Sequence, residues 1–163
     1  MPLWKIVMIA LVFFGAAGLW STFIAPVENR FWAETRTELL YYLPTGFDWT
    51  NMEYMKTFSK PILMITCIYY GIFNVLIGPV TEELYFRGYL SSHYKKQGWF
   101  VPILISVLFS LYHFWLPFNN VFRVLVFTPV FYIVYRKKNI YIGIWFHCIC
   151  NLFSVVSYVL EIF

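Results

Sequence analysis

Hydrophobic residues fill four long stretches of the chain that contain no Asp, Glu, Lys or Arg. These stretches are residues 6–25, 61–81, 98–122 and 139–160. About 20 apolar residues in a helix cross the roughly 30 Å hydrocarbon core of a bilayer. A fifth and shorter apolar segment, residues 121–135, carries Arg123, which can reach toward lipid headgroups or into a helix bundle. The pattern predicts five transmembrane helices, because the short alternating segments of a membrane barrel are absent.

Composition supports a membrane protein of the all-α class. Hydrophobic residues make up 61% of the 163 positions and charged residues only 12%, whereas soluble domains hold about 25% charged residues. The high apolar content excludes a disordered chain, and three cysteines do not suggest a disulfide scaffold. The net charge of +4 includes no basic stripe, so we expect membrane lipid and no nucleic acid as a partner.

The first apolar stretch allows two interpretations. Lys5 precedes it and the small residues Gly15, Ala16 and Ala17 lie within it, as in a secretory signal peptide. The uncharged run nevertheless continues to Pro26, so we expect an uncleaved membrane span.

Basic residues in the short loops predict the orientation of a multi-pass protein in the cell membrane. With five spans, the N-terminus and loops 94–98 and 136–138 share one side, which holds Lys5, Lys95, Lys96, Arg136, Lys137 and Lys138. Basic loops face the cytoplasm, so the N-terminus is predicted to be cytoplasmic and the C-terminus external. Residues 26–60 then form a long external loop, in which residues 28–43 predict an amphipathic helix, either interfacial or packed on the bundle.

Two adjacent carboxylates follow the second apolar stretch. Glu83 and Arg87 are four residues apart, so they share a helix face on which they can form an ion pair. Glu82 points about 100° away from Glu83 and is available for another task. The alternative is that all three charges lie at the interface and reach for headgroups. An acid within a membrane is otherwise a functional candidate, because its burial is costly.

Other polar residues interrupt the later apolar stretches. His113 lies in the third stretch, and His147 lies in the fourth with Asn151 one turn further on the same face. A single membrane histidine is often a helix–helix contact. Two histidines, an amide and a carboxylate pair on separate helices are better explained by a site within the bundle.

These residues form three motifs that resemble the CPBP family. The motifs are Glu-Glu-x-x-x-Arg (Glu82, Glu83, Arg87), Phe-x-x-x-His (Phe109, His113) and His-x-x-x-Asn (His147, Asn151). The family comprises CAAX proteases and bacteriocin-processing enzymes, including Rce1-type intramembrane glutamic endopeptidases and Abi proteins. The resemblance divides the chain into an N-terminal span with its amphipathic loop, residues 1–60, and a catalytic core of four spans, residues 61–163.

The resemblance also implies a mechanism and a role for each residue. Glu82 would activate a water with help from His113, and His147 and Asn151 would stabilise the oxyanion. The supporting residues would be Glu83, Arg87 and Phe109. The implied activity is metal-independent hydrolysis of a membrane-associated peptide or protein. The bulky residues 124–135 depart from the small residues that family members often carry there, which affects the expected substrate size.

Three alternatives accompany this interpretation. A zinc site could form from one of the two glutamates with both histidines, although the sequence holds no His-Glu-x-x-His motif. A bacteriocin self-immunity or membrane scaffolding protein of the same family would bind a partner without turnover. A small transporter would be expected to show more helices or paired broken segments.

Overall fold

The computed structural model describes residues 1–42, 51–94, 98–113 and 120–163, and these residues form helices and no β-strand. The helices are α1 (Leu3–Phe31), α2 (Ala33–Tyr41), α3 (Met52–Met55), α4 (Lys60–Ile72), α5 (Gly78–Glu83), α6 (Phe100–Tyr112), α7 (Asn120–Lys137) and α8 (Tyr141–Ile162), with π-helical segments η1 (Phe73–Ile77) and η2 (Leu84–Leu90). The predicted all-α membrane bundle is confirmed.

The segments α4, η1, α5 and η2 follow one another without a break and form one long helix. The spacing of its backbone hydrogen bonds increases from four to five residues in η1, where the Gly78 N–H donates to the carbonyl of Phe73. The same five-residue spacing occurs at the end of η2, where the Ser91 N–H donates to the carbonyl of Phe86. Such π segments occur often at functional sites. The short helix α5 between them carries both glutamates.

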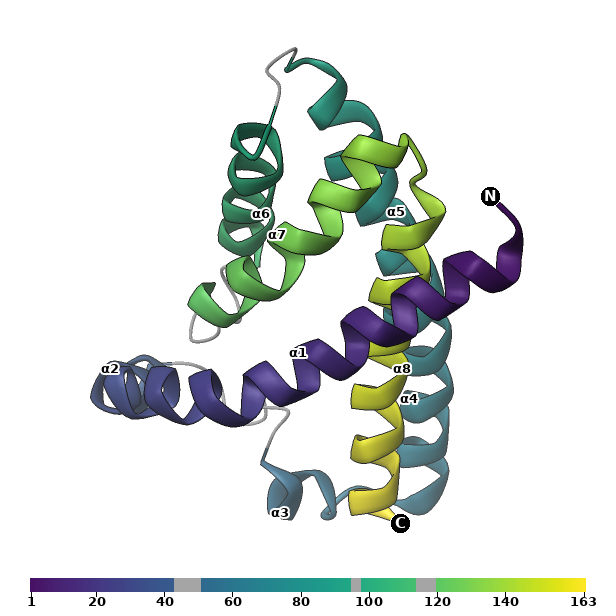
Figure 1. Cartoon of the computed structure of the whole chain (residues 1–163). Coiled ribbons are helices and arrows are strands. Elements are labelled where there is room, and N and C mark those ends of the chain that lie inside the picture. The colour runs from purple at the N-terminus through teal and green to yellow at the C-terminus, as the bar shows by residue number, and fades with distance from the viewer. Residues whose placement is uncertain (43–50, 95–97, 114–119) are drawn as a thin grey trace.

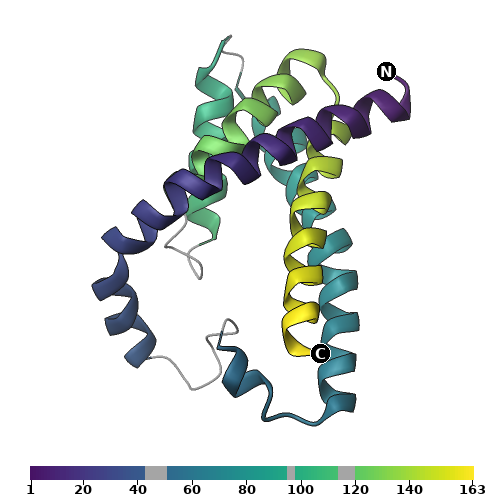
Figure 2. The same ribbon diagram turned by 60° about the horizontal axis from the view of Figure 1, so that its bottom comes forward.

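The other helices pack around this long helix. Helix α8 runs beside it in the opposite direction, while α1 crosses α8 and α7 obliquely (Figures 1 and 2). Helices α6 and α7 form a hairpin that contacts η2. The main hydrophobic cluster joins α1, η2, α6, α7 and α8, so the N-terminal span shares its core with the segment expected to be catalytic.

Three helical segments have the length and hydropathy of membrane spans: Leu3–Phe31, Lys60–Leu90 and Tyr141–Ile162. They expose large apolar side chains, such as Leu19 at 70% and Ile65 at 68%, which lipid tails would cover. Helix α7 corresponds to the expected segment 121–135. The chain end at Met1 and the turn between α7 and α8 lie at one end of the bundle, opposite the C-terminus (Figures 1 and 2).

Two predicted boundaries are corrected by the structure. The stretch 98–122 is not one span: α6 ends at Tyr112 with His113 as its C-cap, and α7 begins at Asn120. With 13 residues, α6 is about 20 Å long and shorter than a bilayer core.

The second correction concerns the predicted amphipathic helix over residues 28–43. Helix α1 continues through Pro26 to Phe31, so the first residues of the expected helix belong to α1. Only Ala33–Tyr41 form the separate helix α2, and residue 43 lies outside the described residues. Hydrophobicity alone placed the end of the span at Pro26, whereas the helix ends at Phe31, with Trp32 as its C-cap.

Candidate active site

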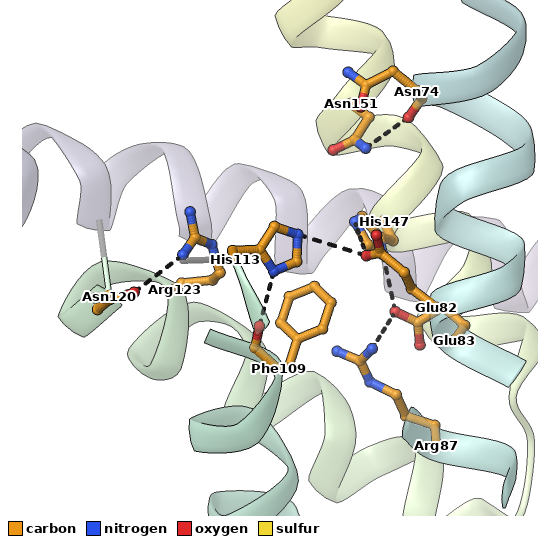
Figure 3. Close-up of polar contacts among 10 residues, drawn as sticks. All are labelled: Asn74, Glu82, Glu83, Arg87, Phe109, His113, Asn120, Arg123, His147 and Asn151. Atoms are coloured by element: carbon orange, nitrogen blue, oxygen red, sulfur yellow. Dashed lines mark hydrogen bonds and ion pairs between the residues drawn. The ribbon is translucent and has the colours of Figure 1, made fainter. Parts of the chain in front are cut away.

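Glu83 lies at the centre of a buried ionic cluster. Its side chain has no solvent exposure, and its Oε1 lies 3.0 Å from Arg87 Nη1 and 3.1 Å from His147 Nδ1 (Figure 3). The expected Glu83–Arg87 pair on one helix face is therefore present in the structure. The same carboxylate also fixes the ring of a histidine on another helix, a contact that residue spacing could not reveal.

Aromatic rings surround the Arg87 guanidinium. Its Cζ lies 3.2 Å from the ring centre of Phe131 and 4.3 Å from that of Phe109. A cation over an aromatic face is attracted by the quadrupole of the ring, whose face is electron-rich, and more strongly when water is excluded. Aromatic side chains thus cover the Arg87 guanidinium where it does not contact Glu83.

Glu82 points to the two histidines and away from the Glu83–Arg87 pair (Figure 3). Its Oε2 lies 3.6 Å from His113 Nε2 and 3.8 Å from His147 Nε2. Its side chain is 18% exposed, whereas that of Glu83 is completely buried. The two adjacent glutamates consequently have different environments, as their angular separation on a helix predicted.

Hydrogen-bond partners determine which ring nitrogens carry hydrogen. His113 Nδ1 lies 2.8 Å from the carbonyl oxygen of Phe109, which can only accept, so Nδ1 donates. His147 Nδ1 likewise donates to the Glu83 carboxylate. Both rings therefore present Nε2 to Glu82 Oε2. At 3.6 and 3.8 Å these contacts exceed a direct hydrogen bond, and a water lying beside the three atoms could contact all of them.

Phe109 supports both histidines. It is 1% exposed, and its ring packs edge-on against His113 with centroids 4.5 Å apart and against His147 with centroids 5.5 Å apart. Its carbonyl holds His113, and its ring face contacts Arg87. The residue thus joins the ionic cluster to the two imidazoles.

Asn151 lies on α8 one turn beyond His147, and its amide nitrogen donates to the carbonyl of Asn74 over 2.7 Å (Figure 3). The need for this bond follows from η1. The Gly78 N–H is bonded to Phe73, and Pro79 has no N–H to continue the π-helical pattern. The Asn74 carbonyl therefore lacks the donors that residues 78 and 79 would supply in a regular α- or π-helix, and Asn151 provides one. The second N–H of the amide is not used in this bond.

The three cysteines, Cys67, Cys148 and Cys150, are free thiols, as expected for a chain without a disulfide scaffold. Among the residues that the structure describes, no three His, Cys, Asp or Glu side chains form a metal-binding group. The absence of metal from the mechanism remains a prediction.

Comparison with known proteins provides the family. The family model of the Rce1-like type II CAAX prenyl endopeptidases matches residues 63–153. The chain belongs to this family. Neither curated proteins nor solved structures give a significant match to the chain.

Every candidate residue of the Rce1-like chain lies within the matched segment. The structure brings Glu82, His113 and His147 together. Glu83 and Arg87 form a buried ion pair behind them. Asn151 contacts Asn74, and its predicted role in stabilising an oxyanion stays a prediction.

Sequence reasoning missed a second polar network of this Rce1-like protein, at the start of α7. Glu28 on α1 is 6% exposed, and its two carboxylate oxygens accept the backbone N–H groups of Val121 and Phe122, each over 2.9 Å. These groups open α7 and have no partner within the helix. Glu28 was expected in an external loop, and no sequence pattern links it to a helix more than 90 residues away.

Arg123 belongs to the same network and points into the bundle, one of the two directions expected for it. Its Nη1 donates to Asn120 Oδ1 over 3.3 Å, and this oxygen also accepts from Ser110 Oγ over 2.9 Å. The guanidinium lies beside His113 (Figure 3). The network therefore fixes the end of α6, which carries His113, against the start of α7.

Proposed function

We propose that the chain is an intramembrane endopeptidase that hydrolyses a peptide bond with a water activated by Glu82, without a metal. The observation that carries the proposal is the convergence of His113 Nε2 and His147 Nε2 on Glu82 Oε2, at 3.6 and 3.8 Å. A water lying beside these three atoms, within hydrogen-bond reach of each, would be held next to a carboxylate base. Its oxygen would then face a substrate carbonyl entering from the exposed side of Glu82.

The proposed reaction requires a different protonation state of each histidine, and the surrounding charges are compatible with it. Two carboxylates, Glu82 and Glu83, share this region with the Arg87 guanidinium, while the Arg123 guanidinium beside His113 has its own acidic neighbour in Glu28. Uncompensated charge is costly in a low-dielectric interior. A His147 imidazolium restores neutrality and places an N–H at Nε2, while a neutral His113 keeps a lone pair at Nε2 to accept from the water.

The reaction then proceeds in two steps. Glu82 takes a proton from the water, and the water oxygen bonds to the carbonyl carbon of the substrate. The electron pair of the C=O π bond moves to the carbonyl oxygen, which becomes the oxyanion. The oxyanion accepts hydrogen bonds from His147 Nε2 and the second amide N–H of Asn151, each worth about 2.7–4 kcal/mol. The C–N bond then breaks, and the proton on Glu82 passes to the departing amine. The products are a carboxylic acid and an amine.

The substrate class follows from the setting of the site. The helices that carry it expose large apolar side chains, such as Leu84, Leu111 and Leu152, so a substrate held by the membrane can approach it. We propose a membrane-associated peptide or protein as the substrate, of which a prenylated peptide is the form that the family description names. The protein would lie in the cell membrane with its N-terminus in the cytoplasm.

The test is a cleavage assay on the purified chain in lipid vesicles. Membrane-anchored peptides, prenylated and unprenylated, are incubated with the native protein and with Glu82→Gln, and the products are identified by mass spectrometry. Glu34→Gln, at an exposed position on α2, is the matched control. We expect cleavage by the native protein and the control and none by Glu82→Gln. A folded Glu82→Gln that retains biological function would favour immunity or scaffolding instead.

A further inference from the structure

Gly143 is a buried residue of α8 that lies directly against Glu83. A Cβ built at this position would overlap Glu83 Oε2, and it would lie 3.2 Å from Glu83 Cδ and 3.4 Å from Val134 Cγ2. The nearest atoms thus belong to a carboxylate that is completely buried and held by two partners. A side chain at position 143 would require Glu83 to move.

Helix geometry gives no other reason for glycine at this position. Gly143 lies inside α8, its backbone is helical, and glycine weakens a helix relative to alanine. Other helical glycines differ in their surroundings: a Cβ at Gly71 of α4 would meet nothing within 4 Å. The contact with Glu83 distinguishes Gly143 from a glycine that alanine could replace without effect.

We propose that Gly143 is a positioning residue, whose missing side chain lets Glu83 lie against α8 and thereby orients His147. Gly143 and His147 are four residues apart and share a face of α8. Glu83 lies across both positions, with Oε2 against Gly143 and Oε1 3.1 Å from His147 Nδ1. That hydrogen bond fixes the ring so that Nε2 faces Glu82. The catalytic part of this inference rests on the proposed function.

Alanine at position 143 should therefore affect turnover through Glu83. For Gly143→Ala we expect kcat to fall at least 100-fold with a change in KM of less than threefold, because Gly143 contacts Glu83 and not Glu82, beside which the substrate is proposed to enter. Glu83→Asp shortens the acid by one methylene and makes room for the new methyl group. The double variant Gly143→Ala/Glu83→Asp should recover at least tenfold in kcat over Gly143→Ala. Gly71→Ala is the control and should keep native turnover.

Thermal unfolding in detergent measures the same contact without relying on peptidase activity. Gly143→Ala should lower the Tm of the native chain, whereas in a Glu83→Ala background it should leave the Tm unchanged or raise it. This coupling is expected even if the chain proves not to be a peptidase, so failures of the two proposals are distinguishable. Equal Tm shifts in both backgrounds would overturn the inference. It would also be overturned if Glu83→Asp alone is active but Gly143→Ala/Glu83→Asp is no more active than Gly143→Ala.

Discussion

Replacing Arg87 with alanine removes the only residue that the structure shows pairing with Glu83 from the same helix. The exposed fractions of the two side chains are 2% for Arg87 and zero for Glu83, so neither charge is solvated by bulk water. Among the residues that the structure describes, the substitution would leave His147 as the remaining ionic partner of Glu83 and would open a space between Phe109 and Phe131.

The magnitude follows from these contacts. Removing one partner of a buried ion pair costs about 3–5 kcal/mol, because the remaining charge is uncompensated. A desolvated cation over an aromatic face adds about 2 kcal/mol. Since native proteins are stable by about 5–15 kcal/mol, Arg87→Ala should lose a large part of the free energy of unfolding and accumulate at a lower level. Arg87→Lys keeps the charge but not the planar group, so its loss should be smaller.

The assay is thermal or denaturant unfolding of the purified protein in detergent, together with protein level in membranes. Arg30→Ala, at an exposed position of α1, is the control and should change stability by less than about 0.5 kcal/mol. The double variant Glu83→Ala/Arg87→Ala should be less destabilised than the sum of its single variants, because it leaves neither charge alone. An Arg87→Ala protein within about 1 kcal/mol of the native chain would refute this account of the buried pair.

Three further substitutions or treatments test other parts of the structure. Asn151→Ala should reduce turnover by about 10²–10³-fold if its amide serves the oxyanion, and native turnover would contradict this expectation. The same substitution should lower the free energy of unfolding by about 1–3 kcal/mol, because the Asn74 carbonyl loses its donor. Glu28→Ala should cost about 2 kcal/mol by uncapping α7, measured by unfolding, and a loss below about 0.5 kcal/mol would count against the cap. Strong chelators should leave peptidase activity unchanged, and metal analysis should find less than one zinc per chain; activity that depends on one bound zinc would establish the metal alternative.

Local features of the structure were predictable from the sequence. The spacing of Glu83 and Arg87 predicted their pair, and the 100° between adjacent helical residues predicted that Glu82 would face elsewhere. Both statements depend only on helix geometry, which holds wherever a helix forms. The three long apolar helices were predictable because long apolar stretches without charged residues form membrane-spanning helices.

Contacts between distant helices were not predictable in this way. The hydrogen bond of His147 to Glu83 and the contact of Glu83 with Gly143 depend on how α8 packs against α5. The burial of Glu28 depends on α1 crossing the start of α7. The early end of α6 at Tyr112 places His113 at a helix terminus, and the charge pattern does not indicate it, because residues 98–122 contain no Asp, Glu, Lys or Arg. Tertiary packing decides each of these features.

The central claim, that the Glu82 carboxylate is the base, is tested most directly by restoring a carboxylate to a chain that lacks it. Glu82→Ala leaves a space beside His113 and His147 on the partly exposed side of the site. Turnover of a membrane peptide by this variant is measured with increasing concentrations of formate. We predict no detectable cleavage without formate and a rise in turnover with its concentration, whereas Glu83→Ala, whose carboxylate is fully buried, should show no such response. Turnover by Glu82→Ala within tenfold of the native value in the absence of formate would contradict the claim.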